Sequence, residues 1–182
     1  MRSGNLGWSF TTDLGSNFIG SYSFYLLGSP FFWLTIPFPN YVVPYLMGPL
    51  LILKFACAAL TAYLYIRRFT RTPATARLGG LLYAFSGFSV YNIFFNHFHE
   101  AIIVFPLLLL SMELLITENR RGVFALTVAL CAITNYFFFF GMAVFCIIYY
   151  VVKLSTGEYR FRFSAFLWLA FEAVLGILMA AG

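Results

Sequence analysis

The two histidines of the chain, His97 and His99, lie in one short polar stretch beside Glu100. A carboxylate can remove the proton of a hydroxyl group, and histidine titrates nearest neutral pH. This pattern predicts a catalytic site in which Glu100 is the best candidate base and the histidines assist. The alternative is a solvated loop that anchors two helices. Two histidines and one glutamate in one turn are only a weak indication of a metal site, so we assign no metal ligand. A divalent cation is kept as a possible cofactor.

Several other polar side chains are candidates for substrate binding because their amide, hydroxyl or carboxylate groups can form hydrogen bonds with a polar ligand. Asp13 is the only aspartate, and an aspartate close to a glycine is usually a turn residue. The alternative for Asp13 is a carboxylate that faces a sugar phosphate or a metal. The other candidates are Asn92, Asn96, Asn135 and Tyr136.

Three ionisable residues interrupt long apolar blocks: Lys54, Glu113 and Glu172. A charge inside a bilayer is costly and marks a functional site by default. Counted along helices, Lys54 and Glu172 come to similar depth, which allows an ion pair between them. Such a pair either fixes helix packing or lines a groove for a lipid carrier. Glu113 is expected to reach the membrane interface.

The composition excludes a water-soluble domain. The chain is 62% hydrophobic and 9% charged, whereas soluble domains carry about 25% charged residues. Its net charge of +5 lies in short loops between apolar blocks, so we predict no nucleic-acid partner. No phosphate-binding glycine loop, metalloprotease helix or nucleophile elbow occurs. The sequence therefore predicts an all-α polytopic membrane protein with membrane lipid as its surroundings.

Six transmembrane helices are predicted after an external, interfacial loop at 1–41, and together they form a single membrane domain over 1–182. The 122–152 region is too long for one span, so we divide it into two short helices that meet at Asn135. The other predicted spans are 42–66, 79–95, 101–117 and 163–182.

Nine basic residues follow or precede these blocks, and all nine fall on one side if 122–152 is two helices. The positive-inside rule then makes these loops cytoplasmic and puts the turn at Glu100 on the external face of the cell membrane. Because nothing in the chain would carry loop 1–41 outside, we expect a fragment of a longer protein. The alternative is an N-terminus that the first span, 42–66, translocates by acting as a reverse anchor. The nine residues are Arg67, Arg68, Arg71, Arg77, Arg120, Arg121, Lys153, Arg160 and Arg162.

Several short runs, in this order, resemble the bacterial YfhO membrane protein family. The first are Trp8 with Leu14-Gly15-Ser16-Asn17-Phe18, and the loop from Tyr22 to Phe32 that contains Ser29-Pro30-Phe31-Phe32. The later runs are Tyr83-Ala84-Phe85-Ser86-Gly87-Phe88, Asn96-His97, Pro106-Leu107-Leu108 and Thr134-Asn135-Tyr136-Phe137.

The resemblance implies a GT-C-like glycosyltransferase that takes a sugar from a polyprenyl-phosphate carrier at the external face. The implied acceptor is an envelope polymer such as lipoteichoic acid. In GT-C enzymes the key acidic residue usually lies in the first external loop, a region expected upstream of Met1, so Asp13 is given no catalytic role.

Two other functions stay open. A transporter or flippase for a lipid-linked substrate would place Lys54 and Glu172 in its path. In a non-catalytic membrane scaffold, these charges and the external polar groups would matter only for the stability of the protein.

Overall fold

The computed structural model describes residues 8–9, 16–17 and 27–181. Within these residues the chain is helical apart from two short antiparallel strands, β1 (Trp8–Ser9) and β2 (Ser16–Asn17). The all-α prediction is therefore confirmed for the body of the chain. Asp13, predicted to bind substrate, lies outside the described residues.

Four helices are long and apolar enough to cross a membrane: α3 (Val43–Ile66), α6 (Phe98–Glu118), α8 (Tyr136–Ser155) and α9 (Phe163–Ala181). They have between 19 and 24 residues, which matches the ~20 residues that a bilayer core requires. They correspond to the predicted spans at 42–66, 101–117, the second half of 122–152 and 163–182.

The span predicted at 79–95 is wrong in its bounds. The chain instead forms α4 (Pro73–Ala84) and a five-residue helix, α5 (Gly87–Tyr91). Thr72 caps α4 by accepting a hydrogen bond from Thr75 N, and proline at the first helical position suits this start. At 12 residues, α4 rises only ~18 Å, well short of the ~30 Å hydrocarbon core.

The predicted division at Asn135 is confirmed. Helix α7 (Val123–Thr134) ends there and α8 begins at the next residue. Asn135 has extended backbone angles, and its Oδ1 accepts hydrogen bonds from Phe137 N at 3.2 Å and Phe138 N at 3.3 Å. An asparagine that accepts from the first turn is a favoured N-cap, so this residue both stops α7 and starts α8.

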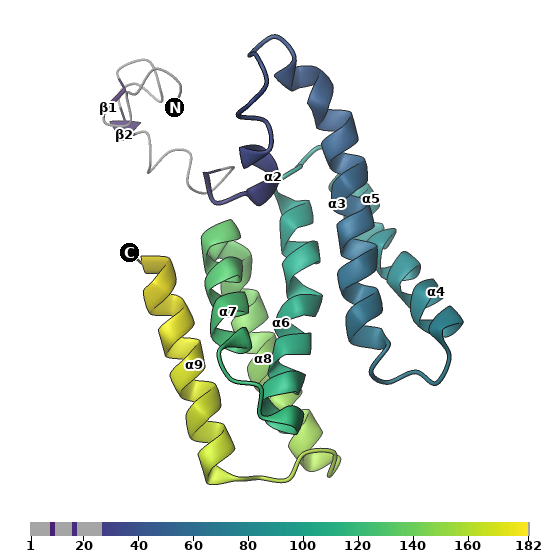
Figure 1. Cartoon of the computed structure of the whole chain (residues 1–182), viewed down its shortest axis with the longest axis vertical. Coiled ribbons are helices and arrows are strands. Elements are labelled where there is room, and N and C mark those ends of the chain that lie inside the picture. Colours follow the sequence, from purple (N-terminus) through teal and green to yellow (C-terminus); the bar gives the residue numbers. More distant parts are fainter. Residues whose placement is uncertain (1–7, 10–15, 18–26, 182) are drawn as a thin grey trace.

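Helix α6 stands at the centre of the bundle, with α3 and α4 on one side and α7 and α9 on the other (Figure 1). Its Leu108 and Met112 are almost fully buried. Small residues allow the close contacts around it. A Cβ atom on Gly80 of α4 would lie 2.6 Å from Ala59 O of α3, and one on Gly176 of α9 would lie 2.6 Å from Ala125 O of α7.

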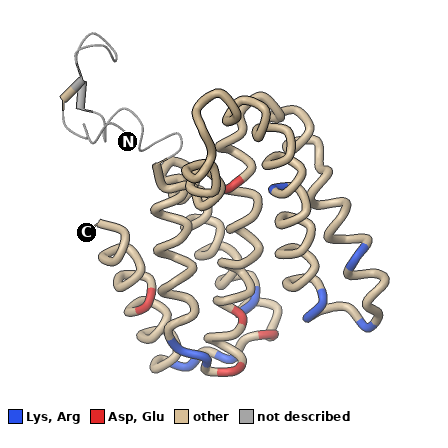
Figure 2. Tube along the Cα trace, turned by 45° about the horizontal axis from the view of Figure 1, so that its top comes forward, with Lys and Arg blue, Asp and Glu red and all other residues tan. Residues whose placement is uncertain are grey.

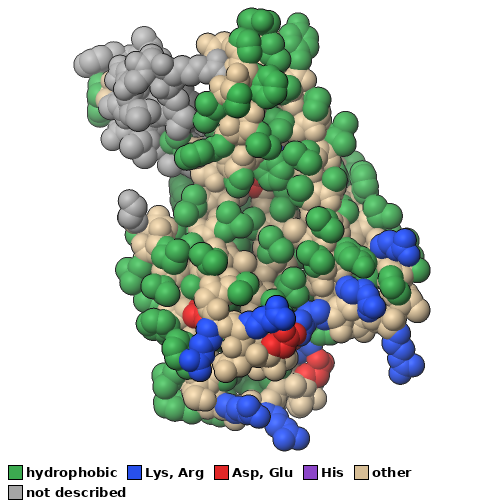
Figure 3. Space-filling model, viewed as in Figure 1, with side chains coloured by type: hydrophobic (Ala, Val, Ile, Leu, Met, Phe, Trp, Pro, Cys, Tyr) green, Lys and Arg blue, Asp and Glu red, His purple; other side chains and the backbone are tan. Residues whose placement is uncertain are grey.

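The basic residues gather at one end of the bundle, and hydrophobic side chains cover most of the face above them (Figures 2 and 3). Arg68, just beyond α3, donates to Glu118 at the end of α6 over 2.7 Å. Arg121 stacks on Trp168 of α9 at 4.1 Å. We call this the basic end and the opposite one the distal end. The predicted gathering of the nine basic residues on one side is confirmed.

Candidate functional site

A buried ion pair joins α3 to the first turn of α6 at the distal end. The Lys54 Nζ atom lies 2.8 Å from Glu100 Oε1, and the two side chains are only 3% and 1% exposed. Lys54 also donates to the backbone oxygen of Asn96 at 2.9 Å and to its Oδ1 at 2.6 Å. The predicted pairing of Lys54 with Glu172 is wrong, because Glu100 is the partner.

The short helix α2 (Pro30–Trp33) covers this pair. Ser29 caps α2 by accepting from Phe32 N at 3.0 Å, and its hydroxyl donates to Glu100 Oε1. The Phe31 ring lies over the Lys54 ammonium at 5.4 Å, a cation–π distance. Sequence reasoning missed Ser29 because Ser-Pro was interpreted only as a break, although serine before proline is also a helix-start signal.

A cavity of about 80 Å³ adjoins the ion pair and is lined in part by Ser29, Thr35, Lys54 and Asn96. The second carboxylate oxygen of Glu100, Oε2, is buried and has no hydrogen-bond partner within the described part of the chain. A buried acceptor without a partner is destabilising, so native proteins keep few of them outside functional or water sites. The site thus combines a cation that lines a small cavity with a buried carboxylate oxygen that lacks a hydrogen-bond partner among the described residues.

His99 is buried beside Glu100 and packs against the Phe55 ring at 5.2 Å. Its Nε2 lies 2.9 Å from the backbone oxygen of Ser89 in α5. A carbonyl only accepts, so Nε2 carries the hydrogen and Nδ1 is left as an acceptor. Nδ1 has no partner among the described residues. Burial of His99 and Glu100 shows that the solvated-loop interpretation is wrong for these two residues.

His97 is the N-cap of α6 and is half-buried. Its ring meets Phe98 edge-on at 4.5 Å and lies near Phe95. Burial, helped by the nearby Lys54 charge, lowers the pKa of His97 below its usual value, so this imidazole stays neutral at physiological pH.

The other predicted substrate-binding residues differ in their surroundings. Asn92 follows α5 and donates to Phe88 O at 2.9 Å. Asn135 is buried. Its Nδ2 and the hydroxyl of the neighbouring Thr134 are both buried and have no hydrogen-bond partner among the described residues. Tyr136 is half exposed. Asn135 and Tyr136 share the distal end with Asn96, as predicted, and Thr134 is a polar group that sequence reasoning missed.

Comparison with known proteins settles the family. A family described as "Bacterial membrane protein YfhO" matches residues 1–182. The chain belongs to the YfhO family. Neither a curated protein nor a solved structure gives a significant match. The resemblance to this family, seen in the aromatic and Asn-aromatic runs, is therefore confirmed. The prediction that the chain is a membrane protein is confirmed as well.

In this YfhO chain Glu172 accepts hydrogen bonds at the start of a helix and is remote from the Lys54–Glu100 pair. Its two carboxylate oxygens accept from Gly122 N at 2.8 Å and Ala125 N at 3.2 Å, at the first turn of α7. The first N–H groups of a helix lack backbone partners, and a negative charge there also suits the helix dipole. Glu172 thereby allows α7 to begin beside α9 with its N–H groups satisfied.

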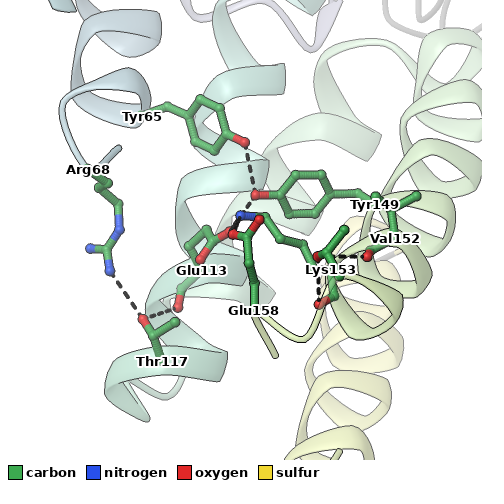
Figure 4. Close-up of polar contacts among 9 residues, drawn as sticks. Tyr65, Arg68, Glu113, Thr117, Tyr149, Val152, Lys153 and Glu158 are labelled. Atoms are coloured by element: carbon green, nitrogen blue, oxygen red, sulfur yellow. Dashed lines mark hydrogen bonds and ion pairs between the residues drawn. The ribbon is translucent and has the colours of Figure 1, made fainter. Parts of the chain in front are cut away.

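A second polar cluster of the YfhO chain lies near the basic end (Figure 4). Glu113 accepts from the Tyr149 hydroxyl and lies 3.7 Å from Lys153 Nζ, and Tyr149 also accepts from Tyr65 at 3.0 Å. Glu113 is buried within the protein, and its position at the membrane interface stays a prediction. These contacts join α3, α6 and α8. Lys153 also pairs with the exposed Glu158.

Acidic and metal-ligating side chains in this YfhO chain stay dispersed. Among the described residues, no three His, Cys, Asp or Glu side chains come close enough to share one metal ion. A divalent cation as cofactor stays a prediction. Cys57, Cys131 and Cys146 are free thiols, and Cys131 and Cys146 are buried.

Proposed function

We propose that this YfhO chain forms part of a glycosyltransferase that moves a sugar from a polyprenyl-phosphate carrier to an envelope polymer such as lipoteichoic acid. The reaction would take place at the distal end, in the site formed by Lys54, Asn96 and Glu100. The observation that carries the proposal is the buried Lys54–Glu100 pair, in which Lys54 lines a cavity and Glu100 Oε2 has no hydrogen-bond partner among the described residues.

The residues suit a direct transfer. The acceptor hydroxyl oxygen would form a bond to the anomeric carbon, and its proton would pass to Glu100 Oε2. The bond between the anomeric carbon and the phosphate oxygen would break, and polyprenyl phosphate would leave with the electron pair. The Lys54 ammonium would stabilise the charge that develops on the leaving phosphate.

Neighbouring groups would orient the substrates. The amide of Asn96 and the neutral imidazole of His97 lie next to the pair and offer hydrogen bonds to sugar hydroxyls. His99 is tied to Ser89 O, which favours a positioning role for it over direct contact with substrate. Asn135 and Thr134 add two more polar groups at this end.

The orientation in the cell membrane follows from charge. Loops rich in lysine and arginine stay in the cytoplasm, so we infer that the basic end is cytoplasmic and the distal end external. Lipid-linked sugars and the growing envelope polymer would then meet at the distal end. The same inference makes the segment before α3 an external loop.

The experiment that tests the proposal uses the full-length protein in membrane vesicles supplied with a radiolabelled polyprenyl-phosphate sugar and the polymer acceptor. Glu100→Gln keeps the shape of the side chain and an oxygen for Ser29, but it removes the base. We expect transfer to fall by roughly 10²-fold or more, in line with the loss of a general base. Flipping of the lipid-linked sugar, measured separately by its accessibility, should be unchanged.

Two controls separate stability from chemistry. Glu118→Gln removes a carboxylate at the basic end and should leave transfer unchanged. Lys54→Met/Glu100→Leu replaces the pair by apolar side chains and should fold but lack transfer. Normal transfer by Glu100→Gln would overturn the proposal. It would favour a flippase if Glu172→Gln abolished flipping, and a scaffold if no variant changed either readout.

A further inference from the structure

A long apolar groove of about 270 Å³ lies between α8 and α9, with α6 and α7 as its floor. The floor is buried: Leu108 is 1% exposed and Met112 is 0% exposed. The walls face outward: Ile147 of α8 is 66% exposed and Ile177 of α9 is 47% exposed. The groove is therefore open toward the surroundings of the bundle along the line between α8 and α9.

The residues that line the groove suit a hydrocarbon ligand. The lining consists of Leu, Met, Phe, Val, Ala, Cys and Ile side chains with the ring of Tyr150, and apolar cavities of this kind exclude water. Along α9 the lining runs from Phe166 to Ile177, about 16 Å at ~1.5 Å per residue. This length is about half of the ~30 Å hydrocarbon core, the depth of one leaflet.

The groove is open on its outer side, toward the surroundings of the bundle. A single extended hydrocarbon chain is thin and can enter it from the lipid side. A further apolar helix or a second copy of this chain would bring no counter-charge to the exposed arginines at the basic end, whereas an anionic lipid would.

The basic end of the groove carries uncompensated positive charge. Tyr150 and Phe166 meet there with ring centroids 6.3 Å apart. The connection between α8 and α9 follows directly below and contains Arg160 and Arg162, both exposed. Neither arginine forms an ion pair with any residue that the structure describes. Exposed arginines next to a bilayer attract anionic head groups.

We propose that this groove binds one acyl chain of an anionic phospholipid from the leaflet at the basic end, with the phosphate group held by Arg160 and Arg162. The site is separate from the Lys54–Glu100 site, which lies at the distal end. It gives the chain a lipid-binding function that does not depend on sugar transfer.

The test places the full-length protein in phosphatidylcholine nanodiscs that contain a phospholipid with a photoreactive diazirine in its acyl chain. Phosphatidylglycerol and phosphatidylcholine probes with the same chain are compared, and adducts are located by mass spectrometry of peptides. We expect adducts on α8 and α9 along the groove. Half-maximal labelling should need roughly a twentyfold lower fraction of the phosphatidylglycerol probe, given two arginines at the head group.

Matched variants assign the contacts. Ala170→Leu fills the groove and should suppress groove adducts with both probes, whereas Ala165→Leu, on α9 but outside the lining, should not. Arg160→Gln/Arg162→Gln should remove the preference for phosphatidylglycerol and keep the adducts. Equal labelling by the two wild-type probes would overturn the proposal. So would groove adducts that survive Ala170→Leu, or a groove occupied by a second copy that crosslinks through α8 and α9.

Discussion

Replacing one partner of the buried Lys54–Glu100 pair should destabilise the protein strongly, whereas replacing both should not. Lys54→Met leaves the Glu100 carboxylate buried with only the Ser29 hydroxyl as a described partner. Glu100→Leu leaves a buried ammonium with only Asn96 oxygens. Each single variant keeps a charge that is no more than 3% exposed without its counter-charge.

The magnitude follows from the burial. Breaking a buried ion pair by removing one partner costs about 3–5 kcal/mol, and replacing both partners by apolar residues of similar volume is often neutral or stabilising. The double variant Lys54→Met/Glu100→Leu should therefore be more stable than either single variant by about 3 kcal/mol or more. The double variant also loses the hydrogen bonds to Asn96 and Ser29, which contribute less to the free energy of unfolding than the burial of an unpaired charge costs.

The assay is reversible unfolding in mixed micelles, followed by circular dichroism, for the wild type, both single variants and the double variant. Arg68→Gln/Glu118→Gln is the matched control for an exposed pair and should change little. If the double variant loses the sum of the two single losses, the pair does not couple, and the structural reasoning for the site fails.

Three further predictions concern positions away from the pair. Glu172→Leu removes two charge-assisted hydrogen bonds to the start of α7 and should lower the free energy of unfolding by about 3 kcal/mol, which the same titration measures. Gly176→Val places a side chain where a Cβ alone would come within 2.6 Å of a backbone oxygen of α7, and should lower the melting temperature in detergent, unlike Gly141→Val, where space is open. Because the folded pKa of His97 lies below 6.5, the unfolded chain binds its proton more readily, so stability should fall as pH drops below about 6.5. This pH dependence should be absent in His97→Gln.

Hydropathy and charge were sufficient to predict most of the architecture. Span-length helices follow from apolar runs of about 20 residues, and the Asn135 break follows from a polar residue in the middle of a run that is too long for one span. The predicted span at 79–95 failed because hydropathy does not register a local helix end. The Ser86-Gly87 step divides α4 from α5 even though the residues on either side of it, Phe85 and Phe88, are apolar.

The partners within the site were harder to predict. Glu100 and Lys54 were both identified as candidates, but depth counting paired Lys54 with Glu172. Depth along a helix ignores rotation about its axis and the order in which helices pack. Helix α6 lies between α3 and α9, so Glu100 reaches Lys54, and Glu172 turns to the first turn of α7.

The separation of the carboxylates bears on the choice between transfer and transport. Glu100, Glu113 and Glu172 each hold a different set of partners, at the distal end, near the basic end and at the start of α7. The hollow between α6, α7, α8 and α9 is apolar throughout its lining. A path for a charged head group needs polar groups that succeed one another through the bilayer core, because each unsatisfied polar group there costs several kcal/mol. Among the described residues, a cation, a buried carboxylate and a small cavity lie together at the distal end, apart from the Glu113 cluster. This arrangement agrees better with the proposed transfer at the distal end than with passage through the apolar hollow.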